Sequence, residues 1–289
     1  MAYTAGQDLG GLRADLGDLP LGGVDSAGVA WRLMQLDGWD SPDSRGEMQQ
    51  RQADHGAWAT PVYLSERPLT LAGVIDAPDR ASLEEAMDRA LVAASLTDTL
   101  LTVWQTTPKQ ALVRRSGRPV VQYLSDRLAS YSLLMTAADP RRYSTVLQSA
   151  TTGLPTSSGG LTPPLTPPVT VAATTVSGQV DAYNEGSFDT RPVLTIDGPV
   201  AAPQVLAQMP DGTVRFLNYS QTLNTGDQLV IDTDAHSAIL NGTVSRRRFL
   251  TTPTGWPVIP PRGTVSFQFR AASYSAGAML TVQWRSAWM

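Results

Sequence analysis

The chain has 289 residues, of which 42% are hydrophobic, and a formal net charge of -4 that excludes a general electrostatic attraction to nucleic acid or anionic lipid. It contains no cysteine, which excludes disulfides, thiolate metal sites and thiol nucleophiles. No signal peptide core and no window of about 18 apolar residues is present, so we expect a protein that is made and stays in solution.

The first elements are expected to be strands. Residues 29–39 are rich in β-branched and aromatic side chains and lead into Asp37-Gly38, a turn pair that fits a hairpin or a strand end. Residues 58–71 contain a second strand-like run, interrupted by Pro61 and Pro68. Because proline cannot donate to a sheet ladder, these prolines favour edge or irregular strands.

One helix is predicted, over residues 79–95. Apolar residues recur there at three- and four-residue spacing, which gives the helix a stripe that must pack on a sheet. Ser82 and Glu85 have the spacing of a capping box, and Asp76 or Asp79 is the alternative cap.

The helix is followed by paired strands. Residues 100–105 and 110–115 flank a turn at Pro108, and residues 119–124 and 130–135 add two more strand-like runs. We therefore expect residues 1–150 to form an α+β domain that is mostly strand with one helix.

Residues 151–168 are rich in proline, threonine, glycine and serine. Such a sequence favours an extended, partly flexible linker between two domains. The alternative, a long surface loop within one domain, is disfavoured because structureless loops longer than about 12 to 15 residues are uncommon in compact domains.

Residues 169–289 are expected to form an all-β sandwich. Short apolar runs alternate with turn signals, of which Asp211-Gly212 and Asn241-Gly242 are favourable hairpin turns because both residues tolerate positive φ. Arg246, Arg247 and Arg248 form a basic run that is expected on a solvated strand.

No catalytic, cofactor or metal site is predicted. His55 and His236 lie in no hydrolase or zinc-binding spacing. The acidic residues Asp37, Asp40, Asp43 and Glu47 could hold calcium or act as paired acids, but they miss the spacing of an EF-hand, and Asp is common in turns. We therefore expect a protein that is not an enzyme and has no cofactor.

Tryptophans are the candidate contact residues. Trp39, Trp58, Trp256, Trp284 and Trp288 could stack on sugar rings or form an interface, although core packing is the default for most of them. We select Trp39, Trp58 and Trp288 as interface or ligand contacts, and Trp288 as the best single candidate because it lies next to the chain end.

An ordered set of motifs resembles the distal tail protein (minor tail protein) family of long-tailed, siphovirus-type bacteriophages. The resemblance spans nearly the whole chain, and its pieces in order are Trp31 to Trp39 with Pro42 and Arg45, the helix, Asp139-Pro140-Arg141-Arg142-Tyr143, Asn184-x-Gly186 with Pro192, Ile196 and Gly198, and Trp256, Pro261 and Gly263.

This resemblance implies a β-rich first domain with one helix that assembles into a ring of six copies, and a galectin-like second domain held outside it. The ring would be a virion component of the tail tip, assembled in the host cytoplasm, that joins the tail tube protein to the tail-tip hub or lysin protein. DNA would pass through its channel without specific binding, and receptor-binding proteins could attach to the second domain.

Two other functions are weighed against this one. The first is a carbohydrate-binding module for host recognition, although the second domain lacks a clear galectin sugar-binding signature. The second is a cell-wall hydrolase, which would need two carboxylates about 5 to 10 Å apart in a cleft that no spacing here encodes.

Overall fold

The computed structural model describes residues 3–158 and 174–289, and the chain forms two compact units. The first unit is built from residues 1–145 and the second from residues 146–288. The division lies before the expected boundary at residue 150. It differs from the prediction because residues just after it already pair with strands of the second unit.

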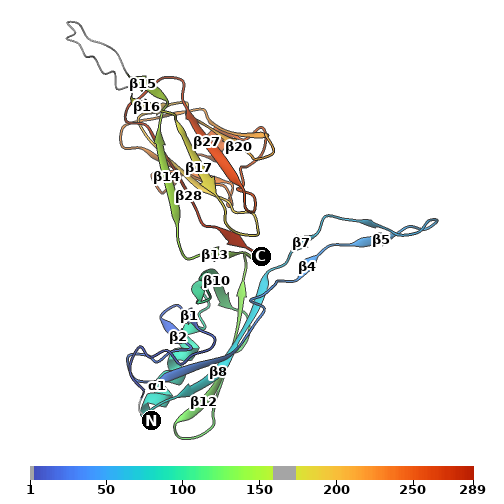
Figure 1. The fold of residues 1–289 in the computed structure, drawn as a ribbon, viewed down its shortest axis with the longest axis vertical. Coiled ribbons are helices and arrows are strands. Elements are labelled where there is room, and N and C mark those ends of the chain that lie inside the picture. Colours follow the sequence, from blue (N-terminus) through green and yellow to red (C-terminus); the bar gives the residue numbers. More distant parts are fainter. Residues whose placement is uncertain (1–2, 159–173) are drawn as a thin grey trace, which may run out of the picture. The chain divides into compact units, whose positions relative to one another are not determined.

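The first unit is a sheet with one helix (Figure 1). Its strands follow the order β2-β1-β9-β10-β12-β8-β3, with β11 on β12 and β13 on β10. Their bounds are β1 Ala14–Leu16, β2 Leu19–Leu21, β3 Ala30–Asp37, β8 Arg67–Asp76, β9 Thr99–Val103, β10 Lys109–Arg115, β11 Val120–Tyr123, β12 Leu128–Ala137 and β13 Arg142–Ser144.

The strand β8 lies between β12 and β3 in the sheet, although Pro68 predicted an edge or irregular strand. It pairs along its whole length with β12, and with β3 only from Thr70 onward. Pro68 therefore has a paired strand on one side only, so its missing N–H costs the sheet no bond on the other side. The predicted strand end at Asp37-Gly38 is correct, because β3 stops at Asp37 and Gly38 has a φ of 79°.

The helix α1, Arg80–Ala93, begins where the sequence predicted. Asp79 is its cap, since its carboxylate accepts a hydrogen bond of 2.9 Å from the Ser82 backbone N–H. The capping box through Ser82 is not formed. The buried side chains Leu83, Ala86 and Ala90 pack into the core of the first unit, where Trp31 is fully buried.

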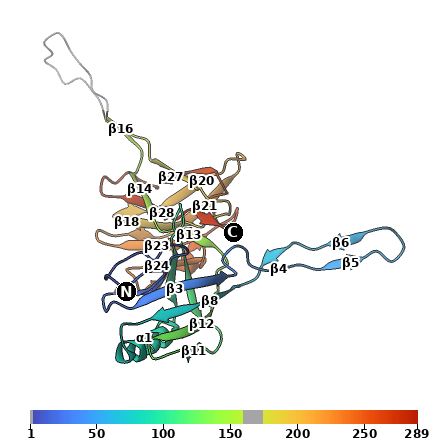
Figure 2. The same cartoon turned by 60° about the horizontal axis from the view of Figure 1, so that its bottom comes forward.

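A two-stranded arm leaves this sheet between β3 and β8 (Figures 1 and 2). Its elements are β4 Ser44–Arg45, which pairs with β7 Tyr63–Leu64, and β5 Met48–Gln50, which pairs with β6 Ala57–Ala59. We call residues 43–63 the arm.

The second unit is a β-sandwich of two sheets with the orders β14-β28-β18-β23-β24-β25 and β17-β27-β20-β21-β26. Their bounds are β14 Gln148–Gly153, β17 Gln179–Tyr183, β18 Val193–Asp197, β20 Gln204–Gln208, β21 Val214–Tyr219, β23 Gln228–Asp232, β24 Ser237–Leu240, β25 Val244–Ser245, β26 Leu250–Thr251, β27 Thr264–Arg270 and β28 Met279–Trp284. Short elements complete the unit: β15 Thr156–Ser158 pairs with β16 Thr174–Val176, β19 Val200–Ala201 pairs with β22 Thr222–Leu223, and β29 Ala287–Trp288 ends it.

The segment expected to be a linker starts within the second unit. Gln148–Gly153 form β14, the edge strand that pairs with β28, and Thr156–Ser158 form β15. The remainder, from residue 159 to 168, lies outside the described residues. Residues 151–153 and 156–158 of this segment are therefore strand residues of the second unit and not part of a linker. Threonine and serine are compatible with an edge strand, and the composition alone did not reveal its partner.

Two turn predictions in the second unit are correct and one strand prediction is wrong. Gly212, Asn241 and Gly242 all have positive φ in hairpin turns. Arg247–Phe249 instead form a short 3-10 helix, η1, so the arginine run does not alternate across a strand. Arg247–Phe249 lie between β25 and β26 and belong to neither strand.

Both units confirm the expected fold class, mainly β with one helix in the first unit and a β-sandwich in the second. The sandwich core is formed by alternate residues of facing strands, as in Val265, Phe267 and Phe269 of β27, which are all fully buried.

Candidate assembly interface

The arm exposes every one of its side chains to solvent. From Asp43 to Tyr63 no residue is buried or half-buried, although the backbone is regularly paired. Thr60 fixes the pairing, since its N–H donates to the Glu47 carbonyl at 3.0 Å and its hydroxyl accepts from the Glu47 N–H at 2.9 Å. The arm is therefore ordered by its backbone and has no core of its own.

Large apolar side chains stand on this exposed ribbon. The exposed fractions are 77% for Met48, 64% for Trp58, 63% for Val62 and 62% for Tyr63. The guanidinium of Arg51 lies 4.4 Å from the centroid of the Trp58 ring and covers one face of it. An isolated two-stranded ribbon is marginally stable in water, and clustered exposed apolar groups mark interaction sites. The arm has the properties of one half of an interface.

The root of the arm is held by a buried arginine. Arg67, which is 0% exposed, donates from Nη1 to the carbonyls of Gly38 and Trp39 at 2.8 and 2.9 Å and from Nε to the Pro140 carbonyl at 2.9 Å. Arg142 donates from Nη1 to the same Trp39 carbonyl at 2.8 Å. The two guanidinium groups thus fix the point where the chain leaves the sheet.

The pKa values of both arginines are lower than that of an exposed arginine. Burial, together with the neighbouring charge of Arg142, lowers the pKa of Arg67 to about 10, while Asp40 and Asp139 act in the opposite sense. Burial also lowers the pKa of Arg142. Both groups remain cationic near neutral pH, so the arm root is held by charge-assisted hydrogen bonds to neutral carbonyls.

A second feature of the first unit is an open sheet face, on the side of β8, β12 and β11 opposite α1. We define it by its outward side chains, which form the cross-strand rows Val120, Ser132 and Ala72; Gln122, Ser130 and Val74; and Leu134 and Thr70. None of these side chains is charged, while Asp76 continues the outward row of β8 and the exposed Arg32 of β3 lies opposite Val74. A recess of about 380 Å³ on this face is lined in part by Met34, Val74 and Val120.

The net charge is unevenly divided between the units. The second unit holds equal numbers of basic and acidic residues, so the whole formal charge of -4 resides in the first unit. The first unit therefore repels polyanions overall, while its open sheet face is neutral.

The three tryptophans selected from the sequence lie in different environments. Trp39 is 4% exposed and belongs to the core of the first unit, so an exposed contact is the wrong role for it. Trp58 lies on the arm, and Trp288 lies half-buried in β29 of the second unit. A contact role for Trp58 and Trp288 stays a prediction.

The remaining tryptophans of the second unit do not form an open stacking platform. Trp256 is stacked on His236 with ring centroids 4.7 Å apart, and Arg247 lies 5.0 Å from the same ring. Trp284 is buried and donates its indole N–H to the Tyr183 carbonyl at 2.8 Å. These contacts occupy the surfaces that a sugar would need.

Sequence reasoning missed the arm and its buried arginine anchor. The local signals were present as a polar stretch from Asp40 onward followed by short strand-like runs, but such a stretch is also typical of a surface loop. In the described part of the chain no group of three or more histidine or acidic side chains could hold a metal, and no helix there is long and apolar enough to cross a membrane.

Comparison with known proteins agrees with this architecture. The family model for the siphovirus-type tail component, C-terminal domain, matches residues 185–288. The crystal structure of Dit (gp 19.1) from phage SPP1, described as a paradigm of the hub adsorption apparatus in phages that infect Gram-positive hosts, has a TM-score of 0.61 at 12% identity. The match covers 89% of this chain and 93% of the SPP1 Dit chain.

A second solved structure, the baseplate of phage P2 in its activated conformation with calcium, has a TM-score of 0.51 at 11% identity and covers 94% of this chain and 97% of that chain. No curated protein sequence matches the chain. The resemblance that the ordered motifs indicated is confirmed: residues 185–288 match the siphovirus-type tail component, C-terminal domain, and the chain has the fold of the SPP1 Dit structure.

Proposed function

We propose that this protein is a structural connector of the phage tail tip. Six copies assemble through their first units into a closed ring, which joins the tail tube protein on one rim to the tail-tip hub protein on the other. The second units carry attachment surfaces for further tail-tip or receptor-binding proteins. The connector acts by binding its neighbours and catalyses no reaction.

The arm is the observation that carries this proposal. It exposes Met48, Trp58, Val62 and Tyr63 on an ordered ribbon that has no core in its own chain. Such a projection meets a different surface on the next copy, which makes the contact heterologous, and heterologous contacts that close generate rings. The buried anchor at Arg67 fixes the direction in which the arm leaves, as a closed ring requires.

The charge distribution supports a channel for DNA inside this ring. The first unit carries the full negative charge of the chain, and the central rows of its open sheet face are uncharged, with Asp76 and Arg32 at their margin. A lumen with these properties offers phosphates few counterion-releasing contacts. DNA would therefore pass without being held.

Electron microscopy and native mass spectrometry of the purified protein test the proposal. We expect hollow rings of six copies that dissociate on dilution. A variant in which residues 48–59 are replaced by a two-residue Asn-Gly turn is the matched control, and it should fold as a monomer. A wild-type protein that stays monomeric at every concentration would overturn the proposal, and rings formed by the shortened variant would overturn the role of the arm.

Sugar binding is the outcome that would favour the carbohydrate-binding alternative instead. Specific glycan binding measured by calorimetry, retained by the isolated monomer and lost with an aromatic substitution in the second unit, would establish it.

A further inference from the structure

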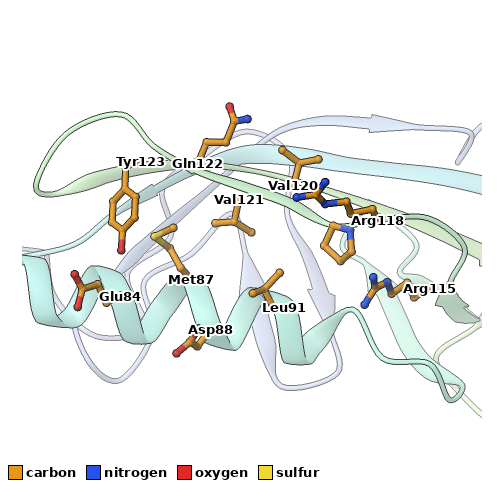
Figure 3. A pocket seen from close by; sticks show the side chains of 11 residues that line it. Glu84, Met87, Asp88, Leu91, Arg115, Arg118, Val120, Val121, Gln122 and Tyr123 are labelled. Atoms are coloured by element: carbon orange, nitrogen blue, oxygen red, sulfur yellow. The ribbon is translucent and has the colours of Figure 1, made fainter.

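A groove on the first unit lies between α1 and the strand β11. Its volume is about 830 Å³, and it is lined by Glu84, Met87, Asp88 and Leu91 of α1, by Val120, Val121, Gln122 and Tyr123 of β11, and by Arg115, Arg118 and Pro119. Figure 3 shows the α1 side chains on one side of this space and β11 on the other. We call it the β11 groove.

The wall formed by β11 is an open strand edge. Among the described residues β11 pairs only with β12, from Val120 opposite Ser132 to Tyr123 opposite Ala129. In an antiparallel pair, alternate residues direct their N–H and C=O groups away from the partner strand. The edge of β11 therefore offers backbone donors and acceptors to a further strand.

The floor of the β11 groove is apolar and one end of it is basic. Met87, Leu91 and Val121 are partly exposed apolar side chains. Arg115 and Arg118 lie at one end, and Glu84 lies at the other (Figure 3), where it is paired with Arg80 at 3.0 Å. Neither Arg115 nor Arg118 forms an ion pair within the described chain; the Nε of Arg115 donates to the Gly117 carbonyl.

Building on the ring proposed above, we infer that the β11 groove receives the arm of a second copy, whose ribbon adds to the edge of β11. The arm has the matching chemistry. Glu47 is exposed next to Met48 at the start of its β5 strand, and Trp58 lies on the paired strand. Arg51, beyond the other end of β5, is paired with Asp54 of the same arm at 3.4 Å. Glu47 therefore matches the basic end of the groove, and the apolar side chains of the arm match its floor.

The arm cannot fill the groove of its own chain. It leaves the sheet at the Arg67 end of β8, whereas α1 follows the Asp76 end, and these ten residues of strand span about 33 Å. Figure 2 shows the arm extending away from α1 and β11. The occupant is therefore the arm of a second copy.

The basic end of the groove sets the register of the added strand. With Glu47 toward Arg118 and the rest of β5 along the apolar floor, the strand β5 runs parallel to β11, and its antiparallel partner β6 is the strand that can pair antiparallel with β11. In this register Ala59 lies near Val120 of the neighbour, and Trp58 faces the apolar floor of the groove.

Engineered disulfides test this register, because the chain has no native cysteine. The double variant Ala59→Cys with Val120→Cys should oxidise to a ladder of covalent multimers in proportion to the rings observed by microscopy. Disulfides require Cβ atoms about 3.5–4.5 Å apart, so a distant pair cannot form one. The control pairs Ala59→Cys with Leu112→Cys on β10, which is exposed but lies outside the groove, and it should give no ladder.

A charge exchange provides the second test and does not depend on oxidation. Arg118→Glu should weaken self-association about tenfold, and adding Glu47→Arg should restore most of it. Rings without the disulfide ladder, or a ladder equally strong in the Leu112→Cys control, would overturn the groove while leaving the connector proposal intact. A protein that forms no rings would overturn the connector proposal itself.

Discussion

Two hairpins of this chain have the same secondary structure and opposite burial. In the β20–β21 hairpin of the second unit, Val205, Ala207, Leu217 and Tyr219 are buried in the sandwich core. In the arm, the β5–β6 hairpin has no buried residue at all. Backbone pairing alone is marginal in water, so the first hairpin is stabilised by its own core and the second needs a neighbour.

The largest effect is expected from removing a buried side chain of the sandwich. Phe267 on β27 is fully buried in the sandwich core, with 0% of its surface exposed. Phe267→Ala should lower the free energy of unfolding of the second unit by about 3–5 kcal/mol, measured by urea denaturation. Thr264→Ala, at an exposed position of the same strand, should change it by no more than about 0.5 kcal/mol. Equal losses in both variants would show that burial does not distinguish the two positions.

The next effect concerns a buried ion pair in the first unit. Asp25 accepts hydrogen bonds from the Trp31 indole at 2.9 Å and from Arg89 at 2.6 Å. Burial alone would raise the pKa of Asp25, but the hydrogen bonds from Trp31, Val29 and Arg89 outweigh it and lower the pKa. Asp25→Asn should therefore destabilise the first unit by about 3 kcal/mol at pH 7.

The same substitution should change the response to acid. Because the folded-state pKa of Asp25 lies below its ordinary value of 3.8, the unfolded chain binds the proton first as the pH falls. Its stabilisation is complete above about pH 5 and is lost through pH 3.8 and below. Urea denaturation between pH 6 and 2 should show a shallower slope in Asp25→Asn than in Asp126→Asn, an exposed control; identical slopes would contradict the assignment.

A smaller effect is expected at the root of the arm. Arg67→Met removes the hydrogen bonds to Gly38, Trp39 and Pro140 and also relieves the burial of a cation, so we expect a net loss of about 2 kcal/mol. Hydrogen exchange at Gly38 and Trp39 should accelerate in the same variant. Arg248→Met, at an exposed arginine of the second unit, is the control, and unchanged exchange at the root would argue against an anchor at Arg67.

The smallest effect on the folded subunit is expected at the arm itself. Trp58→Ala should change the stability of the monomer by less than about 0.5 kcal/mol, yet weaken self-association by more than about tenfold, measured by analytical ultracentrifugation. Leu112→Ala, another exposed apolar position, should leave both quantities unchanged. Loss of stability without loss of assembly would place Trp58 in an intramolecular role.

Much of the fold was predictable because its signals are local. The helix start at Asp79 depends on one side chain that accepts from a backbone N–H three residues ahead. The turns at Asp211-Gly212 and Asn241-Gly242 depend on the low cost of positive φ at Gly212, Asn241 and Gly242. The strands of the sandwich core depend on alternation, as at Val265, Phe267 and Phe269.

The candidate interface was less predictable because its signals depend on distant partners. Trp39 and Trp58 are alike in sequence terms, but the first is buried under the sheet and the second stands on the arm. The same holds for Arg67, whose burial depends on carbonyls contributed by residues 38, 39 and 140. Side-chain type does not encode which remote backbone groups will surround it.

The sequence by itself determined the turns, the helix and its cap, the alternation of the sandwich strands and the family resemblance, because each rests on interactions within a few residues or on motif order. Only the tertiary structure decided that β14 joins the second unit, that the arm stands free of any core, and that the β11 edge lies open beside α1. Those features depend on which strands far apart in the chain pair with one another, and short-range energies leave that choice undetermined.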